Sequence, residues 1–209
     1  MLTGEGCGEI NLMDRPLYPS HLPWLLCCLL TSCVIDDSPA DRSKPALPYE
    51  ESTISIPELR KAAEQGNPDA QNRLGMLYSE GRGVPQDYIQ AKQWFDKAAE
   101  KGHPGAQVNL GTLYFHGNGA PESEQMALSW FRRAAAQGDA LAFAKLGLMY
   151  EQGRGVPQDF IQAHMWYNLS AAHGEKRALE RRDALTKQMT PAQIAEAQRL
   201  AREWTPKPK

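Results

Sequence analysis

From residue 68 onward, apolar residues recur at the spacing of an amphipathic helix. Ala70, Leu74 and Leu77 stand at i, i+4 and i+7, which places them on one stripe of a helix. Asn67 precedes the stripe and is one of the residue types that cap helix N-termini best. The pattern therefore predicts a helix over 68–80.

This helix is part of a pattern that repeats every 36 residues. The recurring positions of its first copy are Ala70, Leu74, Gly75, Tyr78, Gly81, Gly83, Pro85, Ala91, Trp94, Ala98, Ala99 and Gly102. The same types stand 36 positions later and again 36 positions after that, and only Ser170 departs in type. A fixed period of this size is the signature of a stacked-repeat solenoid.

Each copy predicts two helices joined by a linker rich in glycine and proline, residue types that end one helix and prevent its continuation. The second helix begins at Asp87, which with Gln90 has the form of a capping box; the middle copy has Ser123 and Met126 instead, so we expect a weaker cap there. Trp94 is expected to supply bulk to the buried face of this second helix. Gly75 is expected to admit a neighbouring helix where a Cβ would clash.

The repeated pattern, A-x-x-x-L-G-x-x-Y-x-x-G-x-G-V-P-x-D-x-x-x-A-x-x-W-x-x-x-A-A-x-x-G, resembles the Sel1-like repeat, a relative of the tetratricopeptide repeat. The resemblance covers residues 56–178 as a half unit and three full units. It implies an all-α fold, a right-handed α-solenoid of stacked helix-turn-helix repeats with terminal capping helices. Some Sel1-like proteins with a cysteine pair in every repeat are linked to β-lactam binding, but the repeats here contain no cysteine.

The pattern divides the chain into seven segments. These are a signal peptide (1–32), a lipid-anchored cysteine with a disordered tether (33–55), an N-terminal capping half-repeat (56–69), three repeats (70–105, 106–141 and 142–177), and C-terminal capping helices with a tail (178–209).

The first segments suggest an anchored protein. The apolar run 22–30 is too short to span a bilayer, which takes about 20 residues, and fits the core of a signal peptide. It leads into Leu30-Thr31-Ser32-Cys33, which resembles the lipobox of bacterial lipoproteins, with Cys33 as the lipidated residue. Val34 follows it, and the resemblance then implies the outer membrane, facing the periplasm. The alternative is a cytoplasmic protein with an apolar N-terminal tail.

Composition narrows the function. The formal net charge is −2, and residues 34–209 carry 22 bases and 22 acids, so nothing favours nucleic acid as a partner. All four cysteines precede the repeats, and no histidine pair lies near them at zinc-ligand spacing. The repeats also lack motifs such as Gly-x-Ser-x-Gly or His-Glu-x-x-His. We therefore expect no catalytic residue, no metal and no cofactor.

A solenoid offers an extended concave surface, and the positions that differ between repeats are the candidates for recognition. On the first helix of each repeat the candidates are Arg73, Met76, Asn109, Thr112, Phe115, His116, Lys145 and Leu148. Phe115, with Val108, is expected to be an apolar group that stacking leaves exposed, and aromatic anchors dominate interface energetics.

These observations favour a monomeric, non-catalytic scaffold of the bacterial cell envelope that binds a protein or peptide in the concave groove. Two alternatives remain open. One is an envelope protein that binds or hydrolyses cell-wall or β-lactam compounds. The other is a cytosolic Sel1-type regulator, if the signal is spurious.

The lipid anchor can be tested directly. In a bacterial host, the chain is expected to incorporate radiolabelled palmitate, and Cys33→Ser is expected to abolish the label because only that thiol follows a lipobox-like run. Label that survives in Cys33→Ser, or no label in the unaltered chain, would contradict the anchor.

Overall fold

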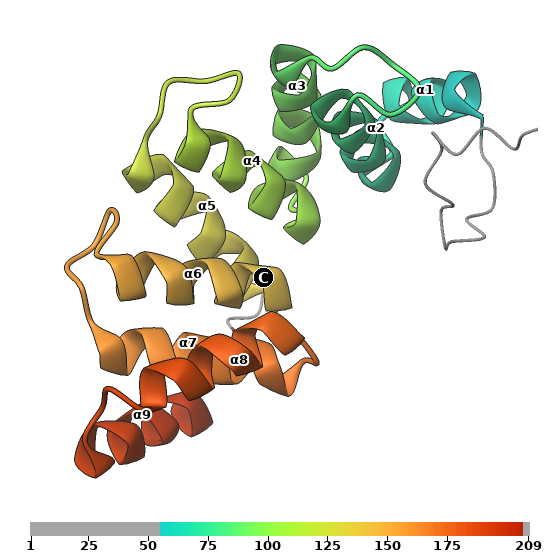
Figure 1. The fold of residues 1–209 in the computed structure, drawn as a ribbon. Helices are drawn as coiled ribbons and strands as arrows, with labels where there is room; N and C mark the ends of the chain where they lie inside the picture. Colours follow the sequence, from blue (N-terminus) through green and yellow to red (C-terminus); the bar gives the residue numbers. More distant parts are fainter. Residues whose placement is uncertain (1–54, 207–209) are drawn as a thin grey trace, which may run out of the picture. The chain divides into compact units, whose positions relative to one another are not determined.

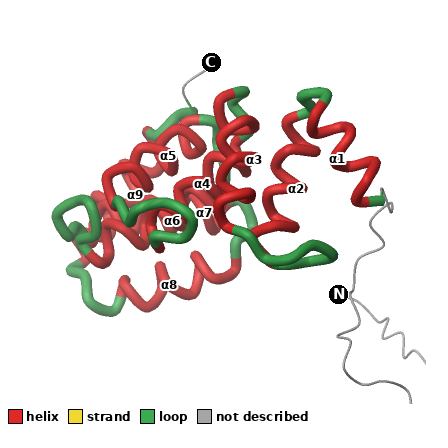
Figure 2. The backbone as a smooth tube through the Cα atoms, turned by 90° about the horizontal axis from the view of Figure 1, so that it is seen from above, coloured by secondary structure: helices red, strands yellow, loops and turns green. Residues whose placement is uncertain are grey.

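The computed structural model describes residues 55–206, and the described part consists of helices and connecting loops without strands (Figures 1 and 2). The helices are α1 Ile56–Glu64, α2 Pro68–Glu80, α3 Tyr88–Glu100, α4 Pro104–His116, α5 Glu124–Ala136, α6 Ala140–Gln152, α7 Phe160–Ala172, α8 Lys176–Thr186 and α9 Pro191–Glu203. The expected signal peptide, Cys33 and nearly all of the tether lie outside the described residues.

The helices pack in sequential pairs. We call α2 with α3 unit 1, α4 with α5 unit 2, and α6 with α7 unit 3, because the closest packing is within these pairs. The second helix of each unit also packs on the first helix of the next, and α1 packs on α2 as the half-repeat expected before unit 1. The predicted all-α repeat fold is confirmed.

Helix starts follow the capping residues of the sequence. The Asn67 side chain accepts a hydrogen bond from the amide of Ala70, so α2 begins where predicted. Asp87 accepts from two amides at 2.9 and 3.0 Å, but only this half of the predicted capping box forms at the start of α3. Ser123 accepts one bond, at 3.3 Å, which agrees with the weaker cap expected in unit 2.

Inside each unit, one aromatic ring lies directly on one glycine. A Cβ built on Gly75 would lie 2.6 Å from the Phe95 ring, so only glycine lets the ring approach the backbone of α2. The same contact joins Gly111 to Phe131 in unit 2 and Gly147 to a tyrosine ring in unit 3. The predicted close approach is therefore made by a ring of the partner helix within the same unit.

The expected role of Trp94 is met only in part. Phe95, one position further along α3, is buried and fills the unit, while Trp94 is half-buried at the edge of the cluster between α1 and α2. Trp94 also carries the Lys97 ammonium 4.2 Å from its ring centre, a cation–π contact. The physical reason is helical geometry, since adjacent residues point about 100° apart and only one of the two can face α2.

In unit 3, a hydrogen bond and an ion pair are added to the contact between ring and glycine. Tyr167 replaces the phenylalanine of the other units, and its buried hydroxyl donates to Glu151 on α6 at 2.5 Å. Arg181 on α8 pairs with the same carboxylate at 2.9 Å. Burial and the Glu151 contact raise the pKa of the Tyr167 hydroxyl, which therefore stays protonated and keeps donating. This network joins α6, α7 and α8.

The two C-terminal helices close the stack by separate routes. Both α8 and α9 pack on α7, each more closely than they pack on one another. Thr190 and Gln193 form a capping box at the start of α9. Because α9 runs along α7, its C-terminal Trp204 reaches the aromatic residues of unit 3.

The ring-on-glycine contact predicts the effect of one added methyl group. Gly111→Ala places a Cβ 2.7 Å from Phe131, and we expect it to destabilise the chain by about 1–3 kcal/mol, as overpacking does, despite alanine's higher helix propensity. Urea unfolding followed by circular dichroism measures the change.

Adding Phe131→Leu to Gly111→Ala should recover part of the loss relative to the sum of the single changes, because the smaller side chain relieves the clash. A more stable Gly111→Ala variant would contradict the close contact.

Candidate functional site

The predicted recognition residues lie on α2, α4 and α6, which we call together the A face. Two rows repeat on it at the 36-residue spacing: Arg73, Asn109 and Lys145 form the first, and Met76, Thr112 and Leu148 form the second. On each helix the two members are three residues apart and thus share a side. All six are half-buried.

Part of the A face is tied together by its own side chains. The Asn109 amide donates to Asn72 Oδ1 at 2.9 Å, which links α4 to α2. The Asn72 amide in turn lies 3.8 Å from the sulfur of Met76. Thr112 donates its hydroxyl to the Val108 carbonyl on its own helix at 2.9 Å. The polar groups between units 1 and 2 therefore already have partners.

Lys145 differs from these neighbours. Its side chain is half-buried on α6, and within residues 55–206 no hydrogen bond or ion pair engages its ammonium group. Burial lowers the pKa of Lys145, because removal from water disfavours the charged form. Leu148, one turn further along the helix, adds a half-buried apolar group on the same side.

The expectation that Phe115 is an exposed anchor was wrong. Phe115 is only 7% exposed, and Val108 is only 4% exposed; both belong to the core cluster between units 2 and 3. Ser79 and Glu151 occupy the equivalent positions in the other units, so the variation looked like a surface signal. His116, beside Phe115, is exposed and meets its ring edge-on at 5.1 Å.

The residue that covers Phe115 comes from the next unit and was not among those predicted from the repeat pattern. The Arg154 guanidinium carbon lies 3.8 Å from the Phe115 ring centre. The same guanidinium pairs with Glu122 at 2.8 Å and with Glu124 at 2.5 Å. Glu124 also accepts from the amide of Gly155 at 2.7 Å. These contacts hold the linker of unit 3 against unit 2. The sequence signal that could have indicated them is the pair of acids at 122 and 124, because unit 1 has no acid at either equivalent position.

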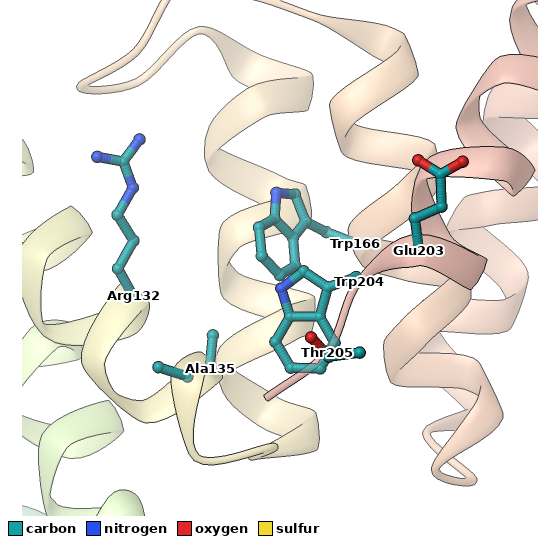
Figure 3. A pocket seen from close by; sticks show the side chains of 7 residues that line it. Arg132, Ala135, Trp166, Glu203, Trp204 and Thr205 are labelled. Atoms are coloured by element: carbon teal, nitrogen blue, oxygen red, sulfur yellow. The ribbon is translucent and has the colours of Figure 1, made fainter. Parts of the chain in front are cut away.

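A pocket of about 400 Å³ opens between α5, α7 and the end of α9 (Figure 3). Its lining residues are Arg132, Ala135, Ala136, Trp166, Glu203, Trp204 and Thr205. The Trp166 and Trp204 rings meet edge to face with centres 6.1 Å apart, and both pack on the fully buried Phe143. The repeat pattern indicates Trp166 only as an equivalent of the packing residue Trp94, and nothing in the sequence predicted this pocket.

One buried histidine lies under α8. His164 on α7 is 2% exposed, and its Nε2 lies 3.2 Å from the Thr186 hydroxyl. Its Nδ1 is buried without a hydrogen-bond partner. Burial lowers the pKa of His164, Arg182 lowers it further, and Asp183 opposes them. The neutral ring is therefore the form that fits this position.

The described residues hold no group of three or more His, Cys, Asp or Glu side chains arranged to bind a metal ion. Within the same range, no helix has both the length and the apolar character needed to cross a bilayer.

Stacked helix pairs with a half unit before them and closing helices after them define an all-α solenoid repeat protein. The model of the Sel1 repeat matches residues 59–67, 68–103, 104–139 and 140–175, which together make up more than half of the chain. The chain belongs to the Sel1-repeat family. Proteins of this family generally mediate protein–protein interactions and are typically non-catalytic scaffolds.

Solved structures agree with this assignment. A Sel1 repeat protein from Oxalobacter formigenes is 37% identical over 62% of this chain and 97% of its own, with a TM-score of 0.55. A protective antigen of uropathogenic Escherichia coli strains is 32% identical over 70% of this chain but only 39% of its own, with a TM-score of 0.54. No curated protein sequence matches the chain significantly.

The buried histidine predicts a pH dependence. The unfolded chain binds a proton at His164 near pH 6.5, whereas the folded chain does so only at a lower pH. Between these two pH values the unfolded state therefore holds more protons than the folded state. The contribution of neutral His164 to the stability of the fold is complete above pH 6.5 and is lost as the pH falls toward the pKa of His164 in the folded chain. Thermal melts at pH 7.5 and pH 5 measure the loss.

His164→Leu is the matched control, because Leu128 occupies the same position in unit 2. We expect the variant to lose less stability than the unaltered chain between these two pH values. Equal losses in the two proteins would rule out His164 as the source.

Proposed function

We propose that this chain is a non-catalytic scaffold that binds an acidic peptide or helix of a protein partner across the A face, and that it does so in the bacterial cell envelope, tethered through Cys33. The coarse part of this function, binding of a protein partner, follows from membership in the Sel1-repeat family. The A face, the acidic partner and the envelope location are the proposal.

The observation that carries it is the Lys145 ammonium. A cation that is partly removed from water and has no ion pair costs folding free energy, and that cost falls when a carboxylate pairs with it. A substitution that removes such a charge and stabilises the fold is easy to find by mutation. The presence of a destabilising cation at position 145 therefore points to a functional role for it. A carboxylate supplied by a partner is the chemistry that matches.

The other residues of the A face suit a segment with both acidic and apolar residues. Leu148 and Met76 supply apolar atoms in one row, and Arg73 adds a second cation to the row of Lys145. The asparagines at 72 and 109 are already bonded to each other, so they hold the helices in place while a partner binds. An extended peptide or a helix can cross several A helices in this arrangement.

The envelope location rests on the lipobox-like run that ends at Cys33. Its support is the sequence pattern alone, and the palmitate experiment decides it. A tether of about 20 residues reaches roughly 60–70 Å when extended, at about 3.3 Å per residue, so the repeats could meet partners away from the membrane surface.

Lys145→Met separates stability from binding. We expect the melting temperature to rise by about 2–4 °C, which is what roughly 1 kcal/mol produces in a chain of this size, because the unpaired charge is gone. We also expect the Lys145→Met variant to lose binding of the partner. A photo-crosslinking residue at position 148, introduced in the native host, measures binding by the yield of one reproducible adduct.

The same crosslinking residue at Gln125, exposed on α5 away from the A face, serves as the position control. Lys145→Glu should abolish the adduct formed at position 148. A Lys145→Met variant that is less stable, or an adduct that persists in both variants, would remove the basis of the proposal.

A further inference from the structure

The pocket between α5, α7 and α9 exists because three positions around it, two in unit 3 and one at the end of α5, depart from their equivalents in the other repeats. Phe143 stands where units 1 and 2 have Gln71 and Gln107. Those glutamines reach back to a carbonyl of the preceding helix, at 3.0 and 3.3 Å. Phe143 instead packs its ring against Trp166 and Trp204, with centres 5.8 and 4.9 Å away. In unit 3, a hydrogen bond to the preceding helix is thus replaced by packing between aromatic rings.

The second departure uncovers the tryptophan of unit 3. In units 1 and 2 this ring is covered by a cation three residues further along, Lys97 over Trp94 at 4.2 Å and Arg133 over Trp130 at 4.5 Å. Leu169 occupies that position in unit 3. Trp166 meets the ring of Trp204 instead, and the two indoles form the apolar wall seen in Figure 3.

The third departure leaves a cation without compensation. Arg132 lines the pocket from α5, and four residues later Ala136 stands where α1 has Glu64 and unit 1 has Glu100. Over the described residues, Arg132 forms no ion pair, and its one hydrogen bond goes to the neutral hydroxyl of Tyr150 at 3.2 Å. A guanidinium has five N–H donors, so most remain available. Alanine at 136 also leaves the wall beneath Arg132 open.

The acid on the opposite wall does not supply this compensation. Glu203 lines the pocket from α9, but its carboxylate pairs with Arg199 at 2.5 Å on its own helix. Figure 3 shows Arg132 and Glu203 on opposite sides of the two indoles. The pocket therefore combines an aromatic wall, small alanines and one uncompensated positive charge.

We propose that this pocket binds the C-terminal residue of a partner polypeptide, with an aromatic side chain against Trp166 and Trp204 and the terminal carboxylate on Arg132. Aromatic rings in contact contribute beyond the area that they bury, and an arginine–carboxylate pair adds a directional charged hydrogen bond. The volume of about 400 Å³ lies in the range of small-ligand sites, roughly 300–1,000 Å³.

A chain end fits this pocket better than an internal segment. At a C-terminus the ring and the carboxylate belong to the same residue, so both fit within one small space. An internal aromatic residue would need an acidic neighbour whose carboxylate lies further from the ring, and the chain would have to leave the pocket on its far side. The assignment is independent of the A face, because none of the lining residues belongs to α2, α4 or α6.

Fluorescence anisotropy of labelled pentapeptides tests the proposal on the full chain. The probe is fluorescein-Gly-Ser-Gly-Ser-Phe with a free carboxylate. The comparison peptides are the C-terminal amide, the same peptide ending in alanine, and one with phenylalanine at the third position. We expect the free acid to bind at least about tenfold more tightly than each of the others, the loss expected when one charged hydrogen bond or one buried ring is removed.

Two variants of the protein test the residues. Ala136→Glu restores the residue type found at this position in α1 and in unit 1, supplies an acid next to Arg132 and narrows the pocket. It should therefore weaken binding of the free-acid peptide by about tenfold or more. Arg132→Gln should do the same. Arg133→Gln is the matched control, because that neighbouring cation lies over Trp130 and does not line the pocket. Circular dichroism should stay unchanged in all three.

The results separate this site from the A face. Lys145→Met should leave peptide binding unchanged. Absence of binding by the free acid, equal binding of acid and amide, or an equal loss in Arg132→Gln and Arg133→Gln would overturn the proposal. In the last case the peptide would be attracted by general positive charge.

Discussion

The contact between one aromatic ring and one glycine determines the geometry of every unit. Phe95, Phe131 and Tyr167 approach the backbone of the preceding helix so closely that any Cβ there would clash. Glycine inside a helix costs about 1 kcal/mol relative to alanine, and the buried ring offsets that cost through the apolar surface it removes from water. Because the contact recurs at nearly the same distance in all three units, the two helices of each unit pack in a similar way, and the units can stack.

A uniform framework makes individual departures informative. When the surrounding geometry is the same, a changed residue at an equivalent position changes the local chemistry and little else. Phe143 in place of a glutamine and Ala136 in place of a glutamate turn the region over Trp166 into an aromatic pocket beside Arg132. In the same way, Lys145 introduces a half-buried cation where unit 2 has Asn109. The two proposed binding surfaces thus arise from substitutions on a shared scaffold.

The prediction that Phe115 is exposed failed for a physical reason. Variation between repeats was used as a sign of exposure, and that inference holds for His116 but not for Phe115. Phe115 is covered by Arg154, which lies 39 residues away in the chain and is held by Glu122 and Glu124. Contacts between units depend on residues of both units, so the pattern of one unit cannot reveal them.

By itself, the sequence determined the all-α class, the repeat length, the number of units and the residues that start α2, α3 and α5. These features depend on local periodicity and on capping, which act within a few residues. Only the tertiary structure decided which of two adjacent aromatic residues fills each unit, that Phe115 is buried, and that α9 runs along α7 to bring Trp204 to Trp166. Those outcomes depend on which surfaces meet in space, and packing between distant segments is not encoded in the spacing of residues along one helix.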